Sequence, residues 1–146
     1  MLSDILTKEN ILIDDGKNLT WEGAIKKASK PLLNSDNITN KYVESMINTV
    51  NSVGPYFNIG DQIVLAHSRP ENGVKKISLS LLKTNNEINL LDEKHPAKLW
   101  FVLGAEDSNS HLSVIQDLVH ILTDKGSMSK LLNSTNKKEI YDVLSK

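Results

Sequence analysis

The sequence predicts an α/β fold: a single domain in which a mixed, mostly central sheet of about five strands is flanked by helices on both faces. Three observations support this prediction. The 146 residues match the length of one ordinary domain, and 39% of them are hydrophobic. Segments with apolar residues at helical spacing alternate with short apolar runs. One run, at residues 98–104, is almost entirely apolar, which is typical of a strand covered on both faces.

The N-terminal third predicts a short amphipathic turn, one strand and two helices. The strand is a brief apolar run at residues 10–14, ended by an Asp-Gly pair. Thr20 is a suitable N-cap for the first helix, which we expect to end before Pro31. Thr39 is the expected N-cap of the second helix, which the Gly-Pro pair at residues 54–55 ends. The residues expected to face inward are Trp21, Ala24, Ile25 and Ala28 in the first helix and Val43, Met46, Ile47 and Val50 in the second.

The middle of the chain predicts four strands. A strand is expected at residues 62–66, of which the last four are apolar, and residues 77–83 carry Ile or Leu at alternate positions. A short strand at residues 88–91 is expected before the charged turn at residues 92–96. The run at residues 98–104 then supplies the central strand.

The C-terminal part predicts three helices. Residues 107–110 are rich in side chains that cap helix N-termini, and a helix with one apolar face begins there. We expect Gly126 to end this helix and two shorter helices to follow, at residues 128–132 and 137–144. The residues expected to face inward in the longer helix are Ile115, Leu118, Val119 and Leu122.

The composition excludes several classes of function. A net charge of −1 leaves no basic stripe that could neutralise a run of phosphates, so nucleic acid is not an expected partner. The absence of cysteine excludes disulfides, thiolate metal sites and a cysteine nucleophile. No apolar run reaches the roughly 18 to 20 residues of a membrane span, and the first residues lack the pattern of a signal peptide. A cytoplasmic protein is therefore expected.

Two of the four histidines are candidates for chemistry. His67 directly follows the apolar strand at residues 62–66, and catalytic groups often lie at the carboxyl ends of strands in α/β sheets. His111 falls in the first turn of the predicted helix, where free N–H groups and the helix dipole favour an anion. By position alone, either could instead be structural, His67 as a hydrogen-bonded strand-end residue and His111 as the top of the apolar stripe. His95, in a charged turn, and His120, on the helix face opposite His111, are expected to be bystanders.

Together, His67, His111 and Arg69 predict a phosphoryl-transfer site. Arg69, two residues after His67, adds a positive charge to the two imidazoles, and such a set of donors suits a tetrahedral dianion. A neutral imidazole, with an ordinary pKa of about 6.5, keeps a nucleophilic nitrogen free at cytoplasmic pH. This chemistry indicates transfer through a phosphohistidine. No metal or cofactor is expected, since HExxH, G-x-S-x-G, P-loop and Rossmann patterns are all absent and Arg69 would repel a metal cation.

The run IVLAHSRPENGV at residues 63–74 resembles the active-site signature of the EIIA components of the phosphoenolpyruvate-dependent sugar phosphotransferase system, mannitol/fructose class. That signature is an apolar strand and a small residue or proline, then His followed by a small residue and often Arg. The resemblance covers almost the whole chain, including the Ser-His-Leu helix start at residues 110–112. Residues 1–146 are therefore expected to form one EIIA type-2 domain. With Arg-Pro-Glu after the histidine and Gly-Pro-Tyr at residues 54–56, the chain is most similar to the ascorbate branch.

The resemblance implies a cytoplasmic phosphocarrier. His67 matches the histidine that accepts a phosphoryl group from phospho-HPr and passes it to a cysteine of EIIB, and His111 matches the second histidine, which helps to hold the phosphoryl group. Because this chain has no cysteine, EIIB is expected to be a separate polypeptide, through which the membrane component EIIC is served. The implied sugar is ascorbate, with another sugar or polyol as the alternative. A regulatory EIIA-like protein, whose phosphorylation state controls a partner, is a further alternative.

One departure from the family pattern concerns charge. Members of the mannitol branch carry an arginine in the helix before the active-site strand, whereas this chain has Asn51 in that neighbourhood and no arginine upstream of Arg69. Either Arg69 supplies the positive charge or the site works with less of it. Tyr56 and Phe57 are candidates for an apolar rim at which two protein partners dock in turn, and a core position is their alternative.

Overall fold

The almost entirely apolar run forms β5 (Pro96–Gly104), the middle strand of a five-stranded sheet with the order β1-β4-β5-β3-β2. The structure, a computed structural model, describes residues 2–145. β5 runs antiparallel to β4 (Ser78–Asn89) and parallel to β3 (Gln62–Ala66). At the two edges, β1 (Ile11–Asp14) is parallel to β4, and β2 (Asn58–Gly60) is antiparallel to β3. The sheet is mixed, which confirms the prediction.

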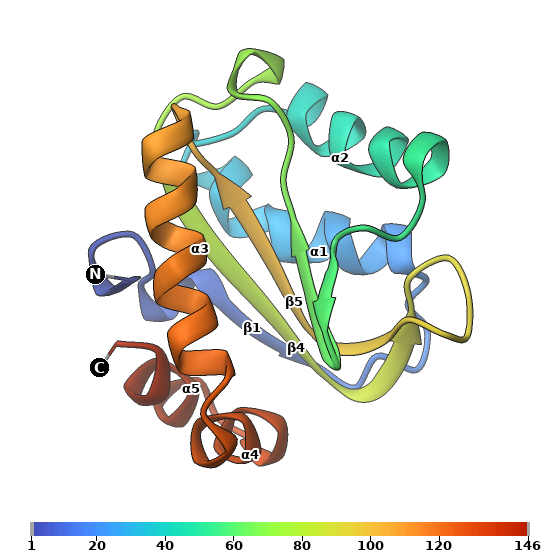
Figure 1. Ribbon diagram of the computed structural model, residues 1–146, viewed down its shortest axis with the longest axis vertical. Helices are drawn as coiled ribbons and strands as arrows, with labels where there is room; N and C mark the ends of the chain where they lie inside the picture. Colours follow the sequence, from blue (N-terminus) through green and yellow to red (C-terminus); the bar gives the residue numbers. More distant parts are fainter. Residues whose placement is uncertain (1, 146) are drawn as a thin grey trace.

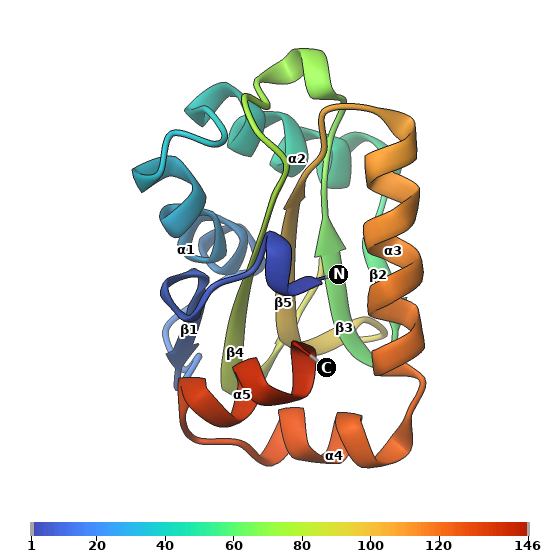
Figure 2. The same ribbon diagram turned by 90° about the vertical axis from the view of Figure 1, so that its left-hand side faces the viewer.

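Within residues 2–145, five α-helices cover the two faces of this sheet (Figures 1 and 2). One face carries α1 (Trp21–Asn34) and α2 (Asn40–Val53). The other carries α3 (Ser108–Leu122), α4 (Lys125–Asn133) and α5 (Lys137–Leu144). Three short 3₁₀ turns complete the fold: η1 (Leu2–Asp4), η2 (Lys8–Asn10) and η3 (Pro70–Asn72). None of these helices is long and apolar enough to cross a membrane.

Alternate residues of β5 belong to two separate apolar layers. Leu99, Phe101 and Leu103 are buried on the side of α3, α4 and α5, whereas Trp100 and Val102 are buried on the side of α1 and α2. Each of these five side chains is at most 1% exposed. Because both faces of the strand are covered, its second half has no polar side chain.

The predicted strands at residues 77–83 and 88–91 form a single strand, β4, so their separation is wrong. β4 continues through residues 84–87 because a shift of register between Lys83 and Ile88 accommodates extra residues while the pairing with β5 resumes. The sequence pattern also fails to predict β2, an edge strand of three residues that is too short to show a period of two. The two errors offset each other, and the number of strands agrees with the prediction.

Two predicted helix ends are wrong. α1 continues through Pro31, because Pro31 and Leu32 are buried in the apolar layer and this burial outweighs the hydrogen bond that proline cannot donate. Gly126 does not end α3. It lies in the first turn of α4, because the Asp124 carboxylate accepts a hydrogen bond from the Ser127 N–H and begins a new helix there.

Other features of the predicted helices are confirmed in large part. The hydroxyls of Thr20 and Thr39 are the N-caps of α1 and α2, each accepting a hydrogen bond from the backbone N–H three residues on. The inward stripe of α3 contains Leu118 and Leu122 as predicted, but it includes Val114, and the predicted Ile115 is only half-buried. The predicted Val119 is wrong, since that side chain is 43% exposed.

The topology brings two loops together at the carboxyl ends of the strands. Because β3 and β5 are parallel and adjacent, their carboxyl ends lie side by side, where His67 follows β3 and α3 begins shortly after β5. The loop after β3 is held to the start of α2, since the Thr39 N–H donates to the Gly73 carbonyl oxygen at 3.0 Å. Gly73 has a φ of +132°, and a Cβ there would lie 1.9 Å from Thr39 Oγ1, the N-cap oxygen of α2.

Gly73→Ala is expected to lower the free energy of unfolding by about 1 to 3 kcal/mol, because a side chain at this φ is strained and its Cβ would displace the N-cap of α2. Urea-induced unfolding measures the change. Gly126→Ala is the matched control, since its new Cβ would lie no nearer than 3.5 Å to its closest neighbour, Asp124 Oδ2, and the residue is exposed. A Gly73→Ala protein as stable as Gly126→Ala would contradict this account of the loop.

Candidate active site

A cleft of about 480 Å³ opens at the carboxyl ends of β3 and β5. Its walls come from one face of α2, the loop after β3 and the first turn of α3. His67, His111 and Arg69 all line it. The three residues that the sequence predicts as a site thus lie together, although they come from different elements.

The imidazole of His67 lies beside two other rings. Its centroid is 4.7 Å from that of His111, edge to face at 65°, and 5.1 Å from that of Phe57, tilted by 44°. Within residues 2–145, the His67 imidazole makes no hydrogen bond. Packing therefore orients the ring, and the alternative of a hydrogen-bonded structural histidine does not apply.

Burial favours the neutral form of both histidines of the cleft. Burial and, to a smaller extent, the charge of His111 lower the pKa of His67 from 6.5 to about 4. Burial also lowers the pKa of His111. At neutral pH, His67 therefore presents a nitrogen lone pair that neither a proton nor a hydrogen bond occupies. A neutral imidazole of this kind is a nucleophile for an electrophilic centre such as phosphorus.

A buried tyrosine hydroxyl fixes the backbone next to His67. Tyr42, on α2, donates to the Leu103 carbonyl oxygen of β5 at 2.6 Å and accepts from the Ser68 N–H at 2.9 Å. Burial raises the pKa of Tyr42 to about 12, so the phenol stays protonated. Tyr42 thus joins the ends of β3 and β5 and sets the direction in which the chain leaves the sheet at His67.

Three polar side chains of the cleft wall form what we call the hydroxyl–amide cluster: Ser45, Ser68 and Asn72. Ser45 Oγ lies 2.6 Å from Ser68 Oγ, and Asn72 Nδ2 donates to these two oxygens at 3.0 Å and 3.1 Å, respectively. All three residues are half-buried. The cluster ties the loop after His67 to α2 by side chains, in addition to the backbone contact at Gly73.

Few formal charges line the cleft. Arg69 is exposed, and its guanidinium makes no hydrogen bond or ion pair within residues 2–145. Asp107 is the N-cap of α3, where its carboxylate accepts from the Ser110 N–H at 2.7 Å, and hydrogen bonds from this helix end lower the pKa of Asp107. The helix start is therefore not as open to an external anion as the sequence predicts, because its own carboxylate occupies part of it.

The α2 residue that faces the cleft at this level is Thr49, not Asn51. Asn51 is exposed and does not line the cleft, whereas the half-buried Thr49 does. Helix geometry explains the difference, since Ser45, Thr49 and Val53 follow one another at intervals of four residues on one face. Asn51 lies about 200° around the helix from Thr49. The α2 wall of the cleft is thus uncharged.

Exposed apolar side chains stand next to the residues of the cleft. Val53, Tyr56 and Leu112 are 60%, 76% and 55% exposed, and Val53 lines the cleft itself. Tyr56 has the exposure that a rim residue needs. Phe57 is only 5% exposed and belongs to the apolar layer of α1 and α2, so its alternative core position is the one observed.

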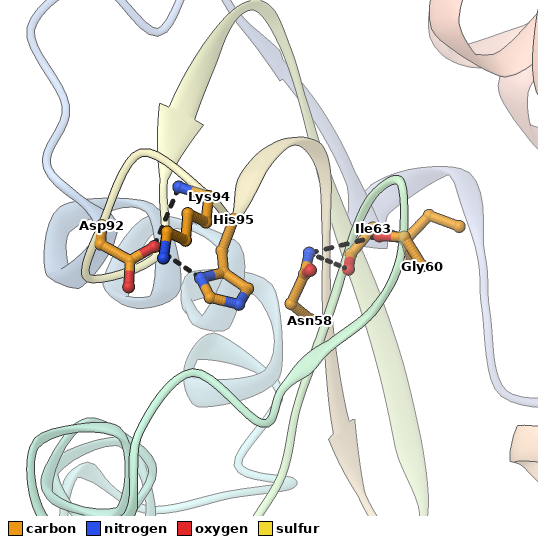
Figure 3. A network of polar contacts seen from close by, with 6 residues as sticks. All are labelled: Asn58, Gly60, Ile63, Asp92, Lys94 and His95. Carbon is orange, nitrogen blue, oxygen red and sulfur yellow. Dashed lines mark hydrogen bonds and ion pairs between the residues drawn. The ribbon is translucent and has the colours of Figure 1, made fainter.

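The other two histidines lie away from the cleft. His95 precedes β5 and so lies at the amino end of that strand, where its Nδ1 is 2.6 Å from the Asp92 carboxylate (Figure 3). His120 is exposed near the end of α3. Neither histidine lines the cleft.

The β2–β3 turn is held by Asn58, whose side-chain amide donates to two backbone carbonyls (Figure 3).

Sequence reasoning missed Tyr42, Ser45 and Asn72. A signal for Tyr42 was present, because it lies four residues before Met46 on the apolar face of the predicted helix, where a tyrosine hydroxyl needs a partner. Nothing in the sequence marks Ser45 or Asn72, since their contacts depend on how the loop after β3 approaches α2.

Comparison with known proteins gives one consistent result. Residues 4–146 match the sequence model of a family described as "Phosphoenolpyruvate-dependent sugar phosphotransferase system, EIIA 2". The chain is 28% identical over 146 residues to the mannitol-specific cryptic phosphotransferase enzyme IIA component of Escherichia coli K12, with 99% of this chain and 98% of that protein covered. It is 30% identical over 146 residues to the ascorbate-specific PTS system EIIA component of the same strain, with 98% and 94% covered.

Solved structures agree with the fold. The solution structure of the mannitol-specific cryptic enzyme IIA of Escherichia coli matches with a TM-score of 0.87 and 28% identity, over 99% of this chain and 97% of that one. A complex of enzyme IIA and phosphorylated enzyme IIB of the mannitol system of Escherichia coli contains a chain that matches with a TM-score of 0.82 and 24% identity, over 96% of both chains. These matches confirm the predicted α/β fold class.

His67 is expected to stay neutral as the pH falls from about 8 to about 5.5, whereas an ordinary histidine, with a pKa of about 6.5, would become protonated. The ¹⁵N chemical shifts of the ring measure this by NMR. Because the folded pKa is below the unfolded one, the unfolded state takes up the proton first, so the stability that His67 contributes falls as the pH drops from about 6.5 towards about 4.

The variant His111→Gln separates the two causes of the shift. It is expected to raise the pKa of His67 only in part, because burial is the larger cause and remains. An inflection of the His67 shifts near pH 6.5 in the folded wild-type protein would show that burial does not protect this imidazole.

Proposed function

Because the chain belongs to the EIIA 2 family of the phosphoenolpyruvate-dependent sugar phosphotransferase system, whose members are phosphocarriers, we propose that His67 is the residue on which it carries the phosphoryl group. One observation on the site supports this proposal most strongly. His67 is a neutral imidazole without a hydrogen bond within residues 2–145, and it lines an open cleft. The family match over residues 4–146 supports one EIIA domain at residues 1–146.

In the proposed reaction, the free nitrogen of His67 attacks the phosphorus of phospho-HPr in line with the bond that breaks. A phosphorus–nitrogen bond to His67 forms while the bond to the donor breaks, so the phosphoryl group moves without release to water. The transition state of such a transfer is loose and needs little covalent help from the protein. Positioning of the ring and stabilisation of charge on the phosphoryl oxygens therefore supply most of the catalysis.

We assign this charge stabilisation to His111 and Arg69. The ring of His111 is 4.7 Å from that of His67, centroid to centroid, close enough for a group bound to His67 to meet it. Arg69 is exposed at the cleft and has no partner within residues 2–145, so its guanidinium can turn towards a phosphoryl group without breaking an ion pair.

The proposed acceptor is a cysteine of a separate EIIB chain in the cytoplasm, because this chain has no cysteine of its own. The membrane component EIIC is then reached only through EIIB. The mannitol enzyme IIA of Escherichia coli forms a complex with phosphorylated enzyme IIB, which supports a direct contact of this kind. The exposed Val53, Tyr56 and Leu112 offer the apolar rim on which phospho-HPr and EIIB would dock in turn.

The proposed sugar is ascorbate. The Arg-Pro-Glu run after Ser68 resembles the ascorbate branch. Ascorbate-specific EIIA components with 28% to 30% identity to the chain support this choice, and a mannitol-specific cryptic component with 28% identity represents the alternative. Because EIIA does not contact the sugar, the choice of EIIB partner decides the pathway that the phosphoryl group enters.

Incubation with phosphoenolpyruvate, enzyme I and HPr is expected to label the chain with a phosphoryl group that is labile in acid and stable in alkali. His67→Gln should carry no label, because the nucleophile is gone. His120→Gln is the matched control, since it makes the same substitution at an exposed histidine outside the cleft. His111→Gln and Arg69→Gln should each be labelled about tenfold more slowly, the effect of losing one charge-stabilising donor at an accessible site.

Two outcomes would contradict parts of this assignment. Label on His67→Gln would show that another residue is the acceptor. Labelling of His111→Gln or Arg69→Gln at the wild-type rate would remove that residue from the site while leaving His67 in place.

The phosphorylated chain is expected to pass its phosphoryl group to an ascorbate-type EIIB with a kcat/KM at least about tenfold above that for a mannitol-type EIIB, a difference of about 1.4 kcal/mol in transition-state stabilisation. Rapid mixing of the labelled chain with each EIIB measures both values. Preference for the mannitol-type EIIB would overturn the sugar assignment, and transfer to neither would favour the regulatory alternative.

A further inference from the structure

The hydroxyl–amide cluster holds a hydroxyl hydrogen that it does not use. The Asn72 amide donates towards the hydroxyl oxygens of both Ser45 and Ser68, and one of these hydroxyls donates its own hydrogen to the other. The hydroxyl that accepts in this contact keeps a hydrogen, for which no acceptor lies in range within residues 2–145. The cleft wall thus carries an unused donor.

This donor is held in place before any ligand arrives. The Ser68 N–H is fixed by the Tyr42 hydroxyl, and the Ser68 hydroxyl is fixed by Ser45 and Asn72. Ser68 follows His67 directly in the chain, and both residues line the same cleft. A donor of this kind needs little reorganisation when negative charge develops in front of it.

The charges around the cleft leave a role for a neutral donor. A phosphoryl group brings close to two negative charges, and Arg69 is the only arginine or lysine among the described residues that line the cleft. The α2 wall presents Thr49 where a cation would help, and the start of α3 is partly occupied by the Asp107 carboxylate. Part of the stabilisation must then come from uncharged groups.

Building on the proposed function of His67, we propose that the Ser68 hydroxyl donates a hydrogen bond to a phosphoryl oxygen during transfer and in the phosphohistidine. In this arrangement Ser45 donates to Ser68 Oγ, which leaves the Ser68 hydrogen for the phosphoryl group. Asn72 is a positioning residue, because its amide holds both hydroxyls without contacting the phosphoryl group. The cluster thereby does with neutral donors what an arginine on α2 would do with charge.

The first test measures labelling from phospho-HPr. Ser68→Ala is expected to be labelled on His67 about tenfold more slowly than wild type, whereas Ser68→Thr, which keeps the hydroxyl, should stay within about threefold. Ser52→Ala is the matched control on α2, because the Ser52 hydroxyl donates to the Asn48 carbonyl oxygen of its own helix and does not line the cleft. It should be labelled at the wild-type rate.

The second test separates a donor from a structural residue. A donor to the phosphoryl oxygens favours their dianionic form, so its loss should raise the pKa of the phosphoryl group by about half a unit or more in Ser68→Ala, measured by ³¹P NMR. A residue that only stabilises the fold would not change this value. Because Asn72 acts through Ser68, adding Asn72→Ala to Ser68→Ala should slow labelling little beyond Ser68→Ala alone.

Labelling of Ser68→Ala at the wild-type rate, with an unchanged phosphoryl pKa, would overturn the inference. If Ser68→Ala does not fold, Ser45→Ala repeats the test, and a slower rate with a raised phosphoryl pKa is expected there too, because Ser68 then loses its partner. Failure of the proposed function looks different, since the wild-type protein itself would then carry no label on His67.

Discussion

One buried hydroxyl connects the three parts of the protein that form the cleft. Tyr42 belongs to α2, its acceptor Leu103 to the end of β5, and its donor Ser68 to the loop after β3. Each hydrogen bond contributes only about 1 kcal/mol, but a phenol left unpaired at this depth would cost about 1 to 3 kcal/mol. The helix, the strand and the loop therefore keep one relative arrangement, on which the position of the His67 ring and of the hydroxyl–amide cluster depends.

The cleft combines two environments that oppose each other. Burial against Phe57 keeps His67 unprotonated, yet the same burial would disfavour a doubly charged group on the ring. The composition of the cleft reconciles these two requirements. Phe57 packs against the imidazole, and the cleft beside it is also lined by Ser68, Asn72 and the solvent-exposed Arg69. Under the proposed function, the apolar contact keeps the ring neutral while these polar side chains would solvate a phosphoryl group bound to it.

The sequence predicts those features that local patterns determine. The apolar run of β5, the threonine N-caps and the strand-end position of His67 follow from periodicity and capping, and the structure confirms them. Pro31 inside α1 and the Val114 stripe of α3 could not be predicted in this way, because burial against the sheet decided them. The hydroxyl–amide cluster depends on the approach of the loop after β3 to α2, which the positive φ of Gly73 permits and no local pattern reveals.

The order of the strands also determines when the cleft can exist during synthesis. β1 pairs with β4, so that Ile11 lies beside Leu81, and β3 pairs with β5, so that Val64 lies beside Trp100. A nascent chain that has emerged only as far as α2 has no central strand against which to bury its two amphipathic helices. These apolar faces would be exposed on the ribosome and open to chaperones until β4 and β5 follow. The proposed phosphoryl acceptor is in this sense a product of the whole chain and not of the short motif that contains it.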